Sequence, residues 1–200
     1  MIRSTCLALL MLLTLPAATC AEGLLAILSK GQRQEKLYYT LDALPPAVSQ
    51  LIAGNQPARE YQDAYRATDD EITKFNLVLI MDKKLHQGIW TGADHDAALA
   101  FLRSCVRNAN PWIKTEAVFA LGNSGDPTAL PDVRTCMDDA SLTAVYHAVL
   151  AWRQLSGDMP ELNAAQQRKV QAFSRLSGDM EAQNALADKE LADFVTHAAF

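Results

Sequence analysis

The chain is 200 residues long, with 23 acidic and 18 basic side chains and a formal net charge of −5 at pH 7. An acidic chain without a run of Lys or Arg is a poor match for a polyanion, so we expect no nucleic-acid partner. Beyond its first residues the chain has no apolar stretch approaching the roughly 20 residues that cross a bilayer, so we expect no transmembrane segment in the mature chain.

The first 21 residues have the order of a secretory signal peptide. Arg3 precedes the apolar run CLALLMLLTL, and Pro16 and the small residues AATCA follow it. Cleavage after Ala21 would leave residues 22–200 as one domain in the periplasm or outside the cell. The alternative is a lipoprotein signal, in which Cys20 becomes the lipidated N-terminus of an outer-membrane protein. We favour cleavage after Ala21, because the usual leucine three residues before the cysteine is missing.

Several helices are expected before the most regular part of the chain. Apolar spacing predicts mostly helix over 22–42 and a degenerate helix pair over 43–88, with its two helices at 43–55 and 69–88. The stretch GIWTGADH, residues 88–95, is the longest expected internal loop. At its end lies the cluster Asp94-His95-Asp96, which we assign to helix capping rather than to a divalent cation, because adjacent side chains at a helix start point apart.

Two segments in the middle of the chain resemble each other. Residues 98–126, ALAFLRSCVRNANPWIKTEAVFALGNSGD, align with residues 129–158, ALPDVRTCMDDASLTAVYHAVLAWRQLSGD. Each contains two apolar helical patterns, with Asn110 expected to cap the second helix of the first unit, and Asp139 or Ser141 that of the next. A period of about 30 residues with two helices is typical of an α-solenoid.

A Gly-Asp pair ends each of these units and recurs once more, so three such pairs are expected to mark turns between helices. A glycine there can take the left-handed conformation that ends a helix, and the aspartate can cap the next helix. Pro127 and Pro160 would then lie in a first helical turn, where the missing N–H costs little. The three pairs are Gly125-Asp126, Gly157-Asp158 and Gly178-Asp179.

The segment IKTEAVFALGNSGDPTALPDV, residues 113–133, resembles the HEAT repeat, in particular the short HEAT-like repeats named after phycobilisome lyases. The resemblance is carried by the pattern of apolar, basic, two alanines, Leu-Gly and then Gly-Asp-Pro. It implies an all-α fold, a short right-handed α-solenoid, or superhelix, of HEAT-like helix pairs. The clearest units are 93–126 and 127–158, with 43–88 a degenerate unit and 159–200 capping helices at 160–175 and 180–198.

No catalytic motif is recognisable in the sequence. Phosphate-binding loops, nucleophile elbows and the His-Glu-x-x-His zinc pattern are missing, so we expect no catalytic residue, no metal and no cofactor. Cys105 and Cys136 occupy equivalent positions in the two units, in a compartment that favours oxidation. Neighbouring helices lie about 8–10 Å apart, whereas a disulfide needs Cα atoms within about 7 Å, so a Cys105–Cys136 disulfide stays open.

Six side chains lie off the apolar stripe of the expected second helices, which commonly line the protein-binding concave face of a solenoid. They form a recognition patch or pack against neighbouring repeats, and the sequence favours packing. Lys114, at the basic position of the repeat, is expected to pair with an acid in a neighbouring unit rather than bind a ligand. The six are Thr115, Glu116, Phe119, Tyr146, His147 and Leu150.

Together these features predict an exported, non-enzymatic interaction scaffold, or an accessory or assembly factor in the cell envelope, whose partner is a protein or peptide. Two alternatives remain. One is a lyase or chaperone-like enzyme on the same scaffold, as the resemblance to lyase repeats implies. The other is a lipid-anchored envelope scaffold, which differs only in whether Cys20 is the mature N-terminus.

Overall fold

The computed structural model describes residues 17–30 and 44–198, and within these ranges all the regular structure is helical. The predicted all-α class is therefore confirmed. None of the helices in these ranges is long and apolar enough to cross a membrane. The α-helices are α1 (Ala17–Lys30), α2 (Pro46–Ala53), α3 (Ala58–Arg66), α4 (Glu71–His86), α5 (Gly92–Cys105), α6 (Pro111–Ser124), α7 (Leu130–Thr135), α8 (Leu142–Ser156), α9 (Ala164–Ser174) and α10 (Met180–Ala198).

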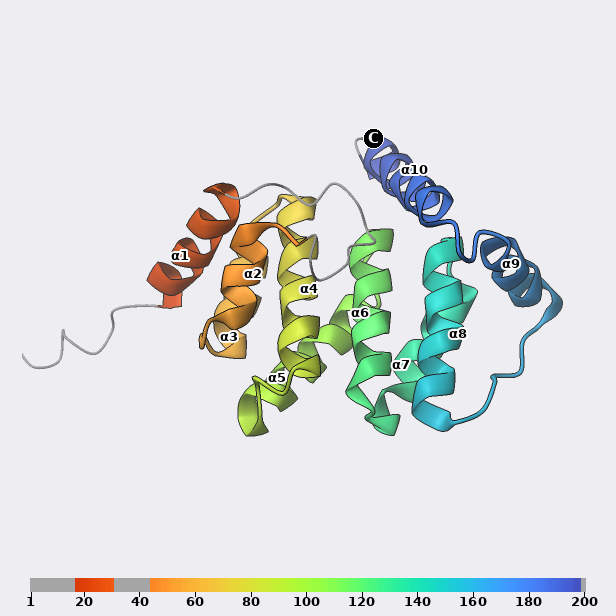
Figure 1. Cartoon of the computed structure of the whole chain (residues 1–200), viewed down its shortest axis with the longest axis horizontal. Helices are drawn as coiled ribbons and strands as arrows, with labels where there is room; N and C mark the ends of the chain where they lie inside the picture. Colours follow the sequence, from red (N-terminus) through yellow and green to blue (C-terminus); the bar gives the residue numbers. More distant parts are fainter. Residues whose placement is uncertain (1–16, 31–43, 199–200) are drawn as a thin grey trace, which may run out of the picture.

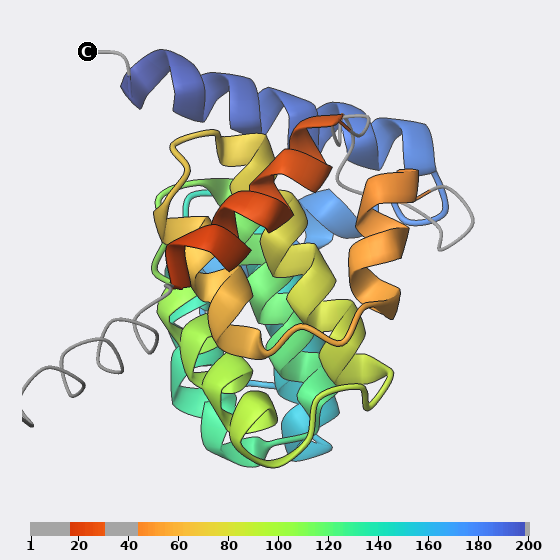
Figure 2. The same ribbon diagram turned by 90° about the vertical axis from the view of Figure 1, so that its left-hand side faces the viewer.

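Helices α4, α6 and α8 lie side by side and form one layer (Figure 1). Behind them, α5 packs against α6 and α7 against α8, while α3 packs against both α4 and α5. Helix α9 packs against α8. Helix α10 crosses over one end of the layer, as the view turned by 90° shows (Figure 2). The middle helix, α6, thus has α4 and α8 on its two sides, α5 behind it and α10 near its start, which makes it the centre of the core.

The expected caps of the second helices are confirmed. The Asn110 side chain accepts hydrogen bonds from the backbone N–H groups of Trp112, at 2.9 Å, and Ile113, at the start of α6. At the start of α8, Ser141 Oγ accepts from Ala144 N at 3.0 Å. Each cap satisfies N–H groups that have no partner within the helix, so a short polar side chain fixes where the helix begins.

All three glycines of the Gly-Asp pairs take the left-handed conformation, Gly178 with φ 88° in the turn after α9, and two of the three aspartates cap the element that follows. Gly125 (φ 68°) and Gly157 (φ 84°) end α6 and α8 in the left-handed conformation. Asp126 caps the short 3₁₀ turn Pro127–Ala129 through Thr128 N, and Asp179 accepts from Ala182 N as α10 begins.

The expectation at Asp158 and Pro160 is wrong. Residues 157–163 form a connection, and α9 begins only at Ala164. The reason is a stronger start signal three residues beyond Pro160. Asn163 and Gln166 form a capping box, in which each side chain bonds the backbone N–H of the other residue.

The N-terminal part differs from the expected single helix pair. The segment 43–88 contains three helices, because α3 lies between the two that the apolar spacing predicted. Of its residues Ala58–Arg66, only the narrow stripe Ala58, Tyr61 and Ala64 is buried, so its polar sequence hides the helix. Upstream, the expected signal peptide lies mostly outside the described residues, and the predicted cleavage after Ala21 falls within α1.

Candidate functional site

The outward side of α6 carries Trp112, Glu116, Phe119 and Asn123, spaced three or four residues apart along one line of the helix. Trp112 is buried and its indole N–H donates to Ala187 O of α10 at 2.8 Å. Glu116 is also buried, whereas Phe119 and Asn123 are half-buried. The line therefore runs from a covered end beneath α10 to a more open end near the turn after α6.

A row of contacting rings crosses the layer at the level of Phe119. The Phe119 ring lies 6.2 Å from the imidazole of His147 on α8, measured between ring centroids. That imidazole lies 5.8 Å from the ring of Phe173 on α9, on which Tyr146 stacks at 4.5 Å. These four residues are called the aromatic row below. At its α4 end, Lys83 Nζ lies 5.4 Å from the centre of the Phe119 ring.

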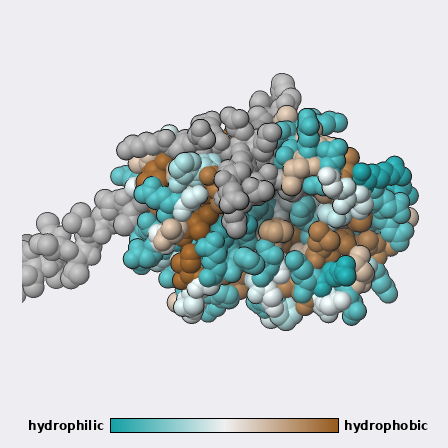
Figure 3. Space-filling model, in the orientation of Figure 1, coloured by the Kyte–Doolittle hydropathy of each residue, from teal (hydrophilic) through white to brown (hydrophobic). Residues whose placement is uncertain are grey.

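The structure brings together some of the six predicted surface residues. Phe119, Tyr146 and His147 all belong to the aromatic row. Their rings pack on one another, as the packing alternative predicts, yet most stay partly exposed, as a recognition patch requires. Leu150, one turn beyond His147 on α8, keeps 38% of its surface exposed. On this face apolar surface shows over α6 and α8, and another apolar stretch lies over α2 to α4 (Figure 3).

Thr115 and Glu116 lie inside the protein, since only 3% and 7% of their surfaces are exposed. The cause is the central position of α6, which has α4 on one side, α8 on the other and α10 at its start. Polar residues on the flanks of a helix with neighbours on both sides can therefore be buried.

Glu116 belongs to a group of charged and polar side chains, here called the Glu116 cluster: Asp82, Lys83, Glu116 and Asn123. Lys83 Nζ lies 2.5 Å from Asp82 Oδ2, and Asn123 Nδ2 donates to Asp82 Oδ1 at 3.4 Å. Asp82 is only 1% exposed, so its carboxylate depends on these two partners. Glu116 Oε1, by contrast, is buried without a hydrogen-bond partner. The cluster thus holds two buried carboxyl groups and one ammonium.

Because two buried carboxyl groups share one ammonium, the pKa values in the Glu116 cluster are shifted. Burial, and then the neighbouring carboxylate of Asp82, raise the pKa of Glu116 to about 8, with Lys83 acting in the opposite direction. Burial by itself would lower the pKa of Lys83, but the attraction of Asp82 and Glu116 outweighs it, and the pKa is raised overall. At neutral pH Glu116 is therefore mostly protonated while Lys83 carries its charge.

His147 is held in one orientation within the aromatic row. Its Nδ1 lies 2.8 Å from the carbonyl oxygen of Thr143, one turn earlier in α8. Because a carbonyl can only accept, the proton must be on Nδ1. Burial lowers the pKa of His147, only partly opposed by this hydrogen bond, so the ring is neutral at pH 7.

The remaining singled-out residues have structural roles. Lys114 forms an ion pair with Asp139 of the next unit, which confirms the expected pairing. Asp94 caps a helix, but not its own, since its Oδ1 accepts from Ala58 N at the start of α3. His95 contacts Asp96 at 3.3 Å on the exposed surface. Among the described residues no group of three or more His, Cys, Asp or Glu could hold a metal ion.

Cys105 and Cys136 are both buried, and both are free thiols in the structure. The thiol of Cys136 donates to the carbonyl oxygen of Val106 at 3.4 Å. Burial raises the pKa of the Cys105 thiol to about 12 and that of Cys136 to about 11. Neither sulfur is a thiolate at neutral pH, so neither is an activated nucleophile.

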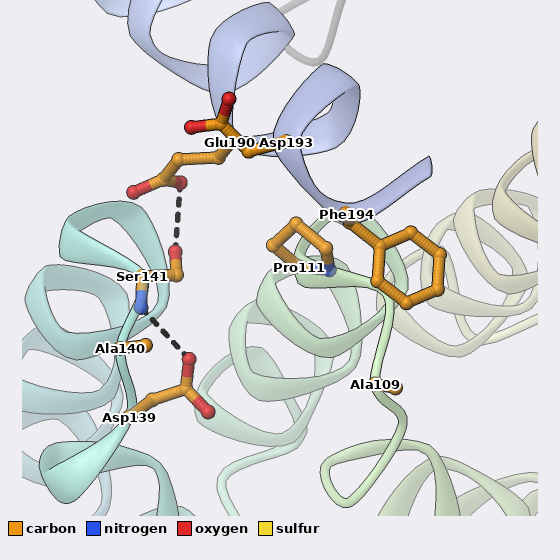
Figure 4. Close-up of a pocket in the computed structure, with 8 residues that line it drawn as sticks. All are labelled: Ala109, Pro111, Asp139, Ala140, Ser141, Glu190, Asp193 and Phe194. Carbon is orange, nitrogen blue, oxygen red and sulfur yellow. Dashed lines mark hydrogen bonds between the residues drawn. The ribbon is translucent and has the colours of Figure 1, made fainter. Parts of the chain in front are cut away.

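A separate cavity of about 320 Å³ lies between α10 and the starts of α6 and α8 (Figure 4). At its edge Glu190 of α10 accepts two hydrogen bonds, from Ser141 Oγ and from Leu142 N, each at 2.7 Å. The carboxylate of a distant helix thereby completes the cap of α8, which local sequence patterns cannot reveal. The residues that line the cavity include Pro111, Asp139, Ser141, Glu190, Asp193 and Phe194.

Compared with known proteins, the chain matches no family model, no curated protein and no solved structure. Its function is therefore inferred from the arrangement of its own residues.

Proposed function

We propose that the chain is an exported, non-enzymatic repeat protein that binds a protein or peptide partner through the aromatic row and Leu150. The observation that carries this proposal is the row itself, which crosses α6, α8 and α9 and has the exposed side chain of Leu150 beside it. Clustered aromatic side chains are the usual anchors of protein interfaces. Apolar surface of this kind on a folded protein is typical of binding sites.

The repeat architecture is part of the same proposal. We interpret the pairs α3/α4, α5/α6 and α7/α8 as HEAT-like units of a short right-handed solenoid, with α4, α6 and α8 as the second helices. The layered packing of these helices and the Gly125 and Gly157 turns support that interpretation. A scaffold, or an accessory or assembly factor of an envelope complex, would use the layer of second helices as its binding face.

Site-specific photo-crosslinking in the native host tests the proposal. A photo-reactive amino acid replaces Leu150 in one strain and Ile89 in another, because the two side chains are matched at 38% and 39% exposure and lie on different parts of the surface. A discrete adduct obtained only from the Leu150 probe is the expected result. Adducts obtained equally from both positions, or none from Leu150 in a folded and exported protein, would contradict it.

The location is tested by the intact mass of the mature protein. Export with cleavage after Ala21 predicts a chain that begins at Glu22 without modification. A mass that corresponds to a lipidated Cys20 would favour the anchored scaffold instead, and the uncleaved mass would argue against export.

A further inference from the structure

Among the described residues the Glu116 cluster has no second cation, so at neutral pH a proton balances the charge of Glu116. Its two buried carboxyl groups, Asp82 and Glu116, share the single ammonium of Lys83, which lies 2.5 Å from Asp82. Glu116 Oε1 is buried and receives no hydrogen bond. A buried polar atom without a partner is destabilising and calls for an explanation, and a ligand that binds there is one.

Within the described part of the chain, Lys83 is the one neighbour that brings a positive charge to Glu116. On α4, Asp82 and Lys83 are the charged groups that act on it. On α8, the titratable side chain at this level is His147, which contacts Phe119 and is neutral at pH 7. Helix α10 meets α6 one turn earlier, through the backbone of Ala187, and α5 packs behind.

We propose that Glu116 binds a Lys or Arg side chain of the partner, at the α4 end of the aromatic row. This inference rests on the proposed function and specifies the chemistry of the partner. Phe119 already accepts one cation, Lys83, on its ring, and a second cation beside Glu116 would meet a carboxylate and an aromatic ring together. Lys83 and Phe119 are only half-buried, so the α4 end of the aromatic row is open on the side from which the partner's side chain would arrive.

Binding of the partner's Lys or Arg to Glu116 exchanges one cation, the proton, for another. Glu116 gives up its proton to solvent, and the partner's cationic group takes the place of that proton beside the carboxylate. Because the proton must leave first, binding strengthens as the pH rises toward the pKa of Glu116, which is about 8. Below that value the expected gain is about tenfold in affinity per pH unit.

The test uses two mixed-sequence hexapeptide pools, one with Arg fixed at a central position and one with the neutral isostere citrulline there. Fluorescence anisotropy at fixed salt measures binding of each pool to the mature protein from pH 6 to pH 8.5. The Arg pool should bind more tightly than the citrulline pool, with a margin that grows with pH. Glu116→Gln should abolish that margin, whereas Glu161→Gln, which removes an exposed carboxylate elsewhere, should preserve it.

Absence of any difference between the two pools across this pH range would overturn the inference, as would a Glu116→Gln variant that keeps the difference. A circular dichroism melt of each variant confirms that it is folded. The proposed function is judged separately, by the crosslink from Leu150, so an adduct there combined with equal binding of the two pools would reject only the Glu116 inference.

Discussion

Lys84 is fully buried, and its ammonium donates a 2.5 Å hydrogen bond to the carbonyl oxygen of Gly54, which lies 30 residues earlier in the chain. The same nitrogen lies 5.3 Å from the ring centre of Tyr61 and 5.2 Å from that of Trp90. The cation thereby joins the turn after α2 to α4 and to the α4–α5 connection. Burial lowers its pKa to about 8, so the ammonium loses its proton in mildly alkaline solution.

Lys84→Met should remove a pH dependence of stability. Between about pH 8 and pH 10.5 the unfolded chain still holds the lysine proton while the folded chain has released it. Unfolding then takes up a proton, so the free energy of unfolding of the wild type rises with pH, by up to about 1.4 kcal/mol per unit. Urea denaturation at pH 7, 8.5 and 9.5 should show this gain relative to Lys84→Met. A difference that is constant across these pH values would contradict the buried cation.

Glu116→Gln should show the opposite trend. The folded chain holds the Glu116 proton up to about pH 8, whereas the unfolded chain loses it near its ordinary value of 4.5. Unfolding in this window releases a proton, so the wild type loses stability as the pH rises, by up to about 1.4 kcal/mol per unit. Relative to Glu116→Gln, its urea midpoint should fall between pH 5 and pH 8. If the urea midpoints of the wild type and Glu116→Gln changed in parallel with pH, the carboxyl group of Glu116 would not be desolvated.

Gly122→Ala should destabilise the contact between α6 and α8. A Cβ at this position would lie 2.8 Å from the Cα and Cβ atoms of Ala151 and 2.5 Å from Gln154 Oε1. The side chain of Gln154 can move, but the backbone of Ala151 cannot, so the helices must separate at a cost of about 1–3 kcal/mol. Thermal denaturation measures the loss. An unchanged melting temperature would mean that the two helices pack less closely than described.

Glu190→Ala should loosen α10. The substitution removes the acceptor of both Ser141 Oγ and Leu142 N, and leaving these donors without a partner costs about 1–3 kcal/mol. Hydrogen exchange of α10 should become faster, while that of α6 and α8 changes less. Lys189→Ala, which alters the adjacent exposed position, is the control and should leave the exchange of α10 as in the wild type.

Local chemistry explains why much of the fold could be predicted. Asn110, Ser141, Gly125 and Gly157 each determine a helix end through their own backbone neighbours, and all four were anticipated from spacing and residue type. Helix α3 was missed, because a helix that buries only three small or amphipathic residues has the composition of a loop.

The candidate site was predicted less completely, because it depends on which helices become neighbours. Lys83 and Asp82 come from α4 and Phe173 from α9, and no pattern within the repeats links them to Phe119. Glu116 and Lys114 lie two residues apart, yet one is a buried carboxyl group and the other a half-buried ion pair. Their difference arises from the side of α6 on which each lies, not from residue type.

The most direct test of the proposed binding face is the affinity of the purified partner, identified by the Leu150 crosslink, for two matched variants. Leu150→Glu places a charge beside the aromatic row, and Ile89→Glu places the same charge at an equally exposed apolar position elsewhere. The binding face described here predicts at least a tenfold weaker Kd for Leu150→Glu, about 1.4 kcal/mol, and an unchanged Kd for Ile89→Glu. Equal affinities of the two variants would contradict it.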